Sequence, residues 1–410
     1  MEASLRSVSF LFLAFLFLPN FFFFFFFCTG LPDVRCIDTE RQALLNFKKH
    51  LIDPSNRLSS WTDDGDCCHW VGVVCHNLTA HVHQLHLRSF PDYESVERYE
   101  AYERSMFGGK LNPSLLDLKH LNYFDLSFNN FSASPIPSFL CSMKSLTSLN
   151  LSNAGFVGLI PQQLGNLSNL HYLNLHGYRP DDLYVNNLEW LSGLPLLQHL
   201  DMSYVNLSKA SDWLQLTNTL PSLFELQLSY CQLPFIPPTP TVNFSSLLTL
   251  NLSGNHFENT LIPSWIFGLR NLVSLDLSYN NFQGPIPVDL QNMTSLSHLG
   301  LSGNNFNSSI PNWLYSFSHL EFLNLRSNNL QGTISNAIGN LTSAISIDLS
   351  RNELGGKLPR SLGNLCNLRE IRLSSNKWSQ EISEILESLS GCLSDRLEIL
   401  DLSSSQLHGI

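Results

Sequence analysis

Histidines are the residues of this 410-residue sequence most suited to bind a metal ion. His81, His83 and His86 lie close together in one short segment. Side chains two residues apart share one face of a strand, and imidazoles bind zinc, copper and nickel. No Asp, Glu or Cys lies beside them at ligand spacing, so we expect no metal site here.

Carboxylates are the residues most suited to acid–base catalysis. Five aspartates recur at one position of a repeated pattern: Asp125, Asp201, Asp276, Asp348 and Asp401. The repeat explains them as solvated side chains between buried leucines better than as catalytic pairs. The sequence also contains no G-x-S-x-G, P-loop, H-E-x-x-H or kinase motif. We therefore expect no enzyme and no cofactor.

Aromatic and arginine side chains favour a binding function instead. Acidic residues outnumber basic ones, 34 to 23, and the net charge of −11 excludes the basic face that nucleic-acid binding needs. Tyr and Arg dominate interface energetics because they offer large contact area and directional donors. We expect ligand contacts above all from Tyr204, Tyr230 and Tyr279. The full set of candidates is Phe128, Tyr172, Tyr204, Tyr230, Tyr279, Phe322, Arg326, Arg351 and Arg372.

An internal repeat, L-x-x-L-x-L-x-x-N, must position these candidates. Its last position recurs twelve times at steps of 24 to 29 residues, seven times as Asn, and a weaker copy at Val82-Leu85-Leu87 makes 13. One copy cannot bury its own leucines, so stacked copies share a core. We expect the Asn side chains to form a buried hydrogen-bond ladder. The predicted fold is an α/β repeat, a right-handed leucine-rich-repeat solenoid with a parallel sheet on its concave face.

Two departures from the repeat stand out. Residues 90–106 insert about 15 residues into the first copy. Long insertions are either functional or disordered, and we favour a solvated loop. The copies that end at positions 154, 178, 205 and 231 lack the Asn. These copies are either specialised for a ligand or merely drifted.

A second motif, F-x-G-x-I-P-x-x-L, continues many copies, as in Phe282-Gly284-Ile286-Pro287-Leu290. With it, and with the segment from Gly108-Gly109-Lys110 to Asp125-Leu126-Ser127, residues 36–410 resemble the ectodomains of plant leucine-rich-repeat receptor-like proteins, those that sense fungal xylanase in particular. The resemblance implies defence signalling triggered by a protein, peptide or glycan ligand of microbial or cell-wall origin. In full-length members it also implies a membrane co-receptor kinase. A secreted inhibitor of microbial cell-wall-degrading enzymes is the alternative on the same fold.

Residues 31–80 resemble the N-terminal cap of that family, and residues 81–410 hold the repeats. Thr39-Glu40-Arg41-Gln42 is typical of a capping box at a helix start. Leu44, Phe47 and Leu51 follow on one helical stripe. The resemblance implies the disulfides Cys36–Cys67 and Cys68–Cys75, with a zinc site as the rival interpretation.

The remaining cysteines are assigned by the repeat. Cys366 and Cys392 lie 26 residues apart, about one coil, so stacking predicts a third disulfide between them. Cys231 occupies a ladder position and Cys141 replaces the Gly of other copies. We expect both thiols to be free.

The N-terminus predicts secretion. Residues 1–30, with an apolar run from Phe10 to Phe27, are typical of a signal peptide; an uncleaved signal anchor is the alternative. We expect a secreted or cell-surface protein with N-linked glycans at Asn77, Asn130, Asn166, Asn206, Asn243, Asn292, Asn307 and Asn340. The sequons at Asn150 and Asn251 should be used least, because they lie on the concave strands. The sequence ends inside a repeat at Ile410, from which we expect a truncated receptor without its membrane anchor and signalling parts.

Overall fold

The computed structural model describes residues 35–90, 95–132, 134–237, 242–257 and 261–407. The expected signal peptide and the acidic residues Asp92 and Glu94 of the insertion lie outside these ranges. Arg35–Ile410 forms one compact unit.

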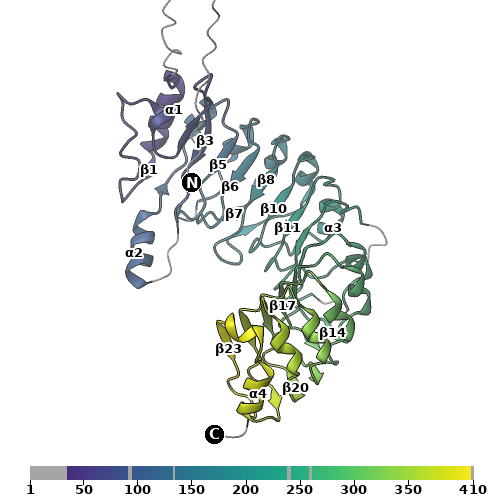
Figure 1. Cartoon of the computed structure of the whole chain (residues 1–410). Coiled ribbons are helices and arrows are strands. Elements are labelled where there is room, and N and C mark those ends of the chain that lie inside the picture. The colour runs from purple at the N-terminus through teal and green to yellow at the C-terminus, as the bar shows by residue number, and fades with distance from the viewer. Residues whose placement is uncertain (1–34, 91–94, 133, 238–241, 258–260, 408–410) are drawn as a thin grey trace, which may run out of the picture. The chain divides into compact units, whose positions relative to one another are not determined.

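A single sheet of 14 strands runs through the unit, and 13 of its strands follow one another in parallel (Figure 1). The first strand, β2, pairs with β3 in antiparallel fashion. The 13 parallel strands match the 13 predicted repeats, and their leucines align in register, as in the pair Leu200 and Leu226. The strands are β2 (Val73–Cys75), β3 (Val82–His86), β5 (Tyr123–Asp125), β6 (Ser148–Asn150), β8 (Tyr172–Asn174), β10 (His199–Asp201), β11 (Glu225–Gln227), β12 (Thr249–Asn251), β13 (Ser274–Asp276), β15 (His298–Gly300), β17 (Phe322–Asn324), β19 (Ser346–Asp348), β21 (Glu370–Arg372) and β23 (Ile399–Asp401).

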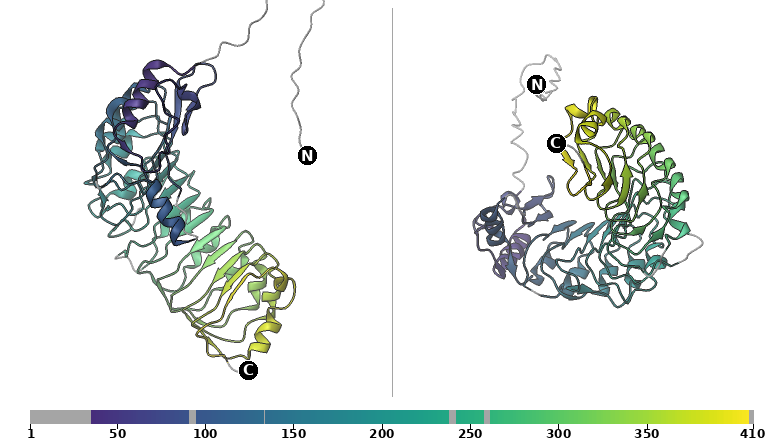
Figure 2. Two further views of the ribbon diagram at one scale, coloured as in Figure 1. Left: turned by 90° about the vertical axis from the view of Figure 1, so that its left-hand side faces the viewer. Right: turned by 90° about the horizontal axis from the view of Figure 1, so that it is seen from below.

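Short helices return the chain on the other side of the unit, so that the sheet lines the inner side of an arc (Figure 2). Proline caps many of them, for example Pro287 before η7, because it fixes φ and needs no donor at a helix start. The helices are α1 (Asp38–Lys48), η1 (Cys67–His69), α2 (Val96–Ser105), η2 (Pro113–Asp117), η3 (Ser138–Ser142), η4 (Gln162–Asn166), η5 (Glu189–Gly193), α3 (Trp213–Thr217), η6 (Ser264–Gly268), η7 (Val288–Asn292), η8 (Asn312–Ser316), η9 (Asn336–Asn340), η10 (Arg360–Asn364), α4 (Ile382–Ser388) and η11 (Cys392–Asp395).

Small ladders join the segments between strand and helix. They comprise β1 (Leu51–Ile52) with β4 (Gly108–Gly109), β7 (Gly158–Leu159) with β9 (Leu183–Tyr184), β14 (Gln283–Gly284) with β16 (Asn305–Phe306), and β18 (Gln331–Gly332), β20 (Glu353–Gly356) and β22 (Lys377–Trp378) together.

The predicted asparagine ladder is confirmed. Asn304 is buried, and its Nδ2 donates to Leu301 O at 3.1 Å and to Leu277 O of the preceding coil at 3.0 Å. Its Oδ1 accepts from Phe282 N. At position 231 a thiol replaces the amide, and Cys231 Sγ lies 3.1 Å from Met202 O. Each ladder residue therefore satisfies backbone groups of two adjacent coils, which explains why the repeat needs it.

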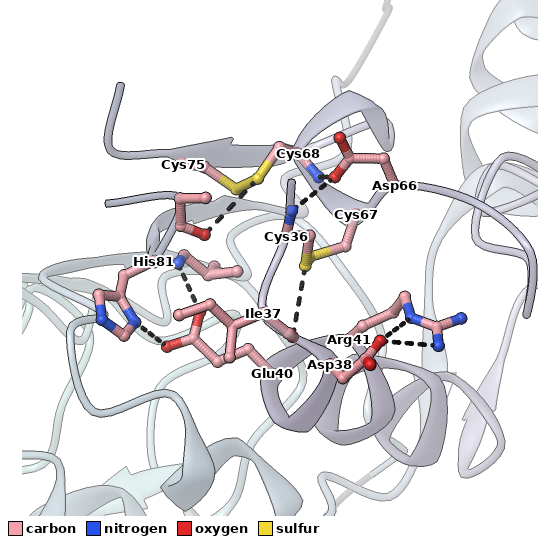
Figure 3. The surroundings of a disulfide bond; sticks show 12 residues. Cys36, Ile37, Asp38, Glu40, Arg41, Asp66, Cys67, Cys68, Cys75 and His81 are labelled. Atoms are coloured by element: carbon pink, nitrogen blue, oxygen red, sulfur yellow. Dashed lines mark hydrogen bonds and ion pairs between the residues drawn. A yellow bond between two sulfur atoms is a disulfide. The ribbon is translucent and has the colours of Figure 1, made fainter. Parts of the chain in front are cut away.

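The three predicted disulfides are present: Cys36–Cys67, Cys68–Cys75 and Cys366–Cys392. Cys141 and Cys231 are free and buried, as expected. The zinc interpretation of the cap cysteines is wrong, because all four sulfur atoms are in disulfides (Figure 3).

The capping box at Thr39 is wrong. Helix α1 begins one residue earlier, at Asp38, and its N-cap is Ile37, which has no side-chain cap. Glu40 is instead buried beneath the cap and hydrogen-bonds to Val82 N at 2.7 Å. The helix ends at Lys48, so Leu51 belongs to β1 rather than to the helical stripe.

The insertion is not simply a solvated loop. Val96–Ser105 forms helix α2, capped by Ser95 Oγ, which accepts from Arg98 N at 3.2 Å. Tyr102 is its buried residue. The helix is attached to the first coil by Tyr102, whose hydroxyl donates to Phe128 O at 3.4 Å, and to the cap by Arg57, which donates to Ser105 O at 3.0 Å.

Candidate ligand-binding surface

The outward side chains of the parallel strands form one continuous surface, which we call the strand face. Alternate residues of each strand point away from the leucine core. The first residues of the strands align across the sheet, so that Tyr172 of β8 lies beside His199 of β10, and His298 of β15 beside Phe322 of β17. A ligand that runs along the sheet would meet these side chains in sequence order.

A groove of about 710 Å³ lies on the strand face over β5–β10. Tyr172 and His199 form one part of its wall, with their rings 5.4 Å apart. His199 also stacks edge-on against Phe224 at 4.0 Å, and its Nδ1 lies 2.7 Å from Glu225 Oε2. Burial raises the pKa of the Tyr172 hydroxyl. The hydroxyl therefore stays neutral and can donate a hydrogen bond. The lining residues are Arg88, Tyr123, Asp125, Thr147, Ser148, Asn150, His171, Tyr172, Gln198 and His199.

A stack of aromatic rings is formed by residues in the turns that follow the parallel strands. Tyr204 and Tyr230 stack at 5.0 Å with an interplanar angle of 14°, and His176 lies 5.3 Å from Tyr204. Burial, together with the neighbouring Tyr204, Tyr279 and Asp276, raises the pKa of the Tyr230 hydroxyl. The three tyrosines Tyr204, Tyr230 and Tyr279 therefore lie near one another in the folded chain.

Glycines make room for these rings. A Cβ on Gly254 would lie 2.5 Å from the Tyr230 ring, and a Cβ on Gly303 would lie 2.6 Å from the Tyr279 ring. Each ring can lie flat only because the next coil has no side chain at that position. The tyrosines themselves adopt the left-handed conformation, with φ of 63° at Tyr204 and 53° at Tyr230, which is costly for bulky residues.

The other candidates are dispersed along the strand face. Phe128 lies in the turn after β5, where the Arg88 guanidinium is 4.9 Å from its ring centroid. Phe322 stacks on His298 at 4.4 Å. These two contacts belong to separate ends of the sheet.

The three arginines differ in how they are held. Arg326 pairs with Asp348 at 3.9 Å, and Arg372 pairs with Glu370 of its own strand. Arg351 is exposed in the turn after β19, with φ of 54°. The structure therefore brings together the tyrosines but not the arginines.

Several residues of the strand face were not predicted from the sequence. His199, His298 and Tyr123 occupy the same strand position as Tyr172 and Phe322, and Arg88 lies over Phe128. Aligning the repeats position by position would have found the first three, because they share a column. Arg88 carries no such signal, because it lies in the irregular first copy.

The aspartate column is not simply solvated. Asp125 and Asp348 are buried, and each Oδ1 accepts a hydrogen bond from the backbone N–H two residues later, at 2.8 Å and 2.9 Å. Asn150 and Asn251 make the same contact in their coils. These side chains close the turn after the strand, which is a structural role.

A second hollow of about 560 Å³ lies beside helix α2. Tyr102 and Glu103 of the helix face Tyr178, Arg179 and Asp182 across it. Tyr178 occupies a ladder position, yet it is 55% exposed. The coil that has Tyr178 in place of the ladder Asn and the inserted helix α2 therefore line the same hollow.

The predicted glycosylation sites lie away from the core. All are exposed except Asn206, which is half-buried and donates to Asp181. Asn166, Asn292 and Asn340 end the helices η4, η7 and η9 on the side opposite the sheet. Glycans at these sites would leave the strand face open.

Comparison with protein families defines the class of protein. Residues 37–76 match the leucine rich repeat N-terminal domain, and leucine rich repeats match at 259–306 and at five further segments between residues 120 and 365. The chain is therefore a leucine-rich-repeat protein with an N-terminal cap. In the described ranges, none of the helices is both long and apolar enough for a membrane span.

Its homologues are plant receptor-like proteins. The chain is 39% identical over 308 residues to receptor-like protein EIX1 of Solanum lycopersicum and 35% identical over 278 residues to EIX2. These matches cover 73% and 67% of this chain, but only 29% and 26% of the relatives. The chain thus spans less than a third of their length.

Solved structures show the same fold. The ectodomain of the Arabidopsis receptor kinase HAESA, in complex with an IDA peptide hormone, matches with a TM-score of 0.70 over 90% of this chain and 61% of its own, at 24% identity. A TDR receptor matches with a TM-score of 0.59 over 73% of this chain and 54% of its own, at 26% identity.

Proposed function

We propose that the chain recognises a ligand outside the cell through its strand face and takes part in plant defence signalling. The ligand is a protein, peptide or glycan of microbial or cell-wall origin. A membrane co-receptor kinase is the signalling partner. This is a binding role, not a catalytic one.

The observation that carries the proposal is the aromatic groove over β5–β10 with the adjoining Tyr204–Tyr230 stack. Both present aromatic side chains that are already ordered by their neighbours, which lowers the entropy cost of binding. Rigid aromatic anchors of this kind supply most interface energy. The homology to receptor-like proteins EIX1 and EIX2 supports a receptor role. Three disulfides support an oxidising, extracellular compartment.

Binding to a fungal endoxylanase tests the proposal. The secreted chain is immobilised, and biolayer interferometry measures the affinity of the purified enzyme for wild type and for Tyr172→Ala and Tyr230→Ala. We expect each substitution to weaken binding by at least about tenfold, as removal of a central aromatic anchor does. Tyr184→Ala is the matched control, because Tyr184 lies in β9, outside the sheet of the strand face, and is 39% exposed.

The same sample separates a receptor from an inhibitor. Xylanase activity measured with a saturating excess of the chain should stay unchanged if the chain only senses the enzyme. Loss of activity would support the inhibitor interpretation. Equal affinities for wild type and both strand-face variants would contradict a binding site on the strand face.

A further inference from the structure

Four histidines from separate segments gather where the cap meets the first coil. His76 follows β2, His81 precedes β3, His83 lies in β3, and His120 precedes β5. The ring centroids of His81 and His120 are 3.8 Å apart, those of His76 and His83 are 4.9 Å apart, and those of His83 and His120 are 6.4 Å apart. The proposed ligand recognition uses none of these four histidines, although β3 pairs with β5, the first strand of the groove.

A buried carboxylate orients one of the rings. Glu40 is 3% exposed, and its Oε1 lies 2.8 Å from His81 Nδ1 (Figure 3). Its second oxygen accepts from Val82 N at 2.7 Å, which fixes the carboxylate in place. With the proton of His81 held on Nδ1 by Glu40, Nε2 carries the free lone pair. A carboxylate behind a ligating imidazole is the usual outer shell of a protein zinc site.

The other three histidines are at least partly exposed and differ in the contacts that they already make. His83 and His81 are two residues apart and share a face of the strand. His120 is exposed, and its ring contacts that of His81. His76 is less suited as a ligand, because its Nδ1 already accepts from Leu78 N at 3.4 Å and contacts Thr79 Oγ1 at 3.2 Å.

We propose that His81, His83 and His120 bind one divalent transition-metal ion of the zinc class, with Glu40 as the positioning residue behind His81. Three imidazoles leave the fourth tetrahedral position to water. The metal would link β3, the first strand of the repeats, to the segment before β5. Glu40 of helix α1 would connect this site to the cap.

The three nitrogens need a small side-chain adjustment to bind together. In the described part of the chain, the only three His, Cys, Asp or Glu residues whose ligand atoms all lie within 4.8 Å of one another are Cys36, Cys67 and Cys68, whose sulfurs are in disulfides. Rotation of the exposed His120 side chain is the adjustment that the proposal requires.

Zinc titration of the full secreted chain tests the site. A colorimetric chelator competes for Zn²⁺ at pH 7.5, with wild type, His83→Ala, His120→Ala and the control His319→Ala. His319 is exposed and lies on the helical side of a distant coil. We expect wild type and the control to bind one equivalent with equal affinity and both site variants to bind at least about tenfold more weakly. Glu40→Gln should weaken zinc binding by about 10- to 100-fold.

Two further measurements locate the ion. Zinc should slow hydrogen exchange in residues 76–86 and 119–123 of wild type but not of His120→Ala. Zinc binding should also weaken when the pH falls from 7.5 to 5.5, because protons compete for the imidazoles. If Glu40→Gln is not secreted, the two alanine variants still decide the question. Absence of zinc binding by wild type, or affinity unchanged in both alanine variants, would overturn the proposal without affecting the proposed strand-face function.

Discussion

At the scale of single residues, the strand face depends on side chains held in costly conformations. Tyr204, Tyr230 and Tyr279 all have positive φ, and their rings lie over histidine, tyrosine or glycine of neighbouring coils. The backbone N–H of each tyrosine donates to a serine carbonyl of the next coil, which holds the turn in this shape. The same turn position has positive φ in other coils too, with 58° at Phe128, 53° at Ser327 and 54° at Arg351, so this backbone conformation belongs to the repeat.

The contact between Gly254 and Tyr230 predicts a specific loss. Gly254→Ala should destabilise its coil by about 1 kcal/mol more than Gly284→Ala, because only the first Cβ meets a ring. Both glycines have positive φ, 70° and 83°, so the backbone cost of about 1–2 kcal/mol is shared. Hydrogen exchange of the flanking amides measures the difference. Equal losses would show that the ring moves aside freely.

The two free thiols predict a reactivity pattern. Burial raises the pKa of Cys141 to about 11 and raises that of Cys231 further. At pH 8 little thiolate exists in either, and both are buried. Iodoacetamide should therefore label neither cysteine in the native protein and both after unfolding in guanidinium, as read by peptide mass spectrometry. Labelling of native Cys231 would mean that the ladder opens at that coil.

At the scale of elements, the ladder and the last disulfide hold neighbouring coils together. Asn304 contacts the backbone of two coils, whereas Cys366–Cys392 links the turn after η10 to η11. The ladder acts inside the stack and the disulfide on its outer side. Each of the two therefore joins only adjacent coils.

Removing the Cys366–Cys392 bridge predicts a local loss of stability. Because the bridge closes a loop of 26 residues, it should add about 3.5 kcal/mol to the free energy of unfolding by reducing the entropy of the unfolded chain. The double variant Cys366→Ser/Cys392→Ser should exchange amide hydrogens faster from η10 through η11, while β5–β10 stay protected. Alanine at the exposed Ser390 is the control. Uniform loosening of the whole chain would contradict this assignment.

At the scale of the molecule, the unit behaves as a one-dimensional stack. Each strand pairs only with the coils before and after it, so stability is a sum of local contributions. A single continuous leucine core nonetheless runs through all coils. Distant coils should therefore respond independently.

Independence of distant coils is testable with two ladder variants. Asn129→Ala and Asn352→Ala each leave buried backbone groups unpaired, at a cost of about 1–3 kcal/mol per group. Hydrogen exchange should rise near β3–β6 in the first variant and near β17–β21 in the second, and the double variant should show the sum. A larger combined effect would show coupling along the stack.

The two cap disulfides followed only from the resemblance to a known family. The sequence by itself determined the repeat, the 13 parallel strands, the asparagine ladder and the Cys366–Cys392 disulfide. Each of these recurs at fixed spacing, and stacking converts spacing along the chain directly into neighbours in space. The stretch Tyr204–Tyr230–Tyr279 was predictable for the same reason. The sequence also placed the Phe and Arg candidates along the strand face, but it did not show which residues contact them.

Only the tertiary structure showed which residues of the cap, the insertion and the repeats contact one another. The sequence showed no acidic ligand near His81, and the fold brings Glu40 to it from 41 residues away, with His120 from a later coil. The insertion around Tyr102 meets the irregular coil at Tyr178 in the same way. Such contacts depend on how the cap and the insertion pack against the stack, and no periodic spacing encodes that packing.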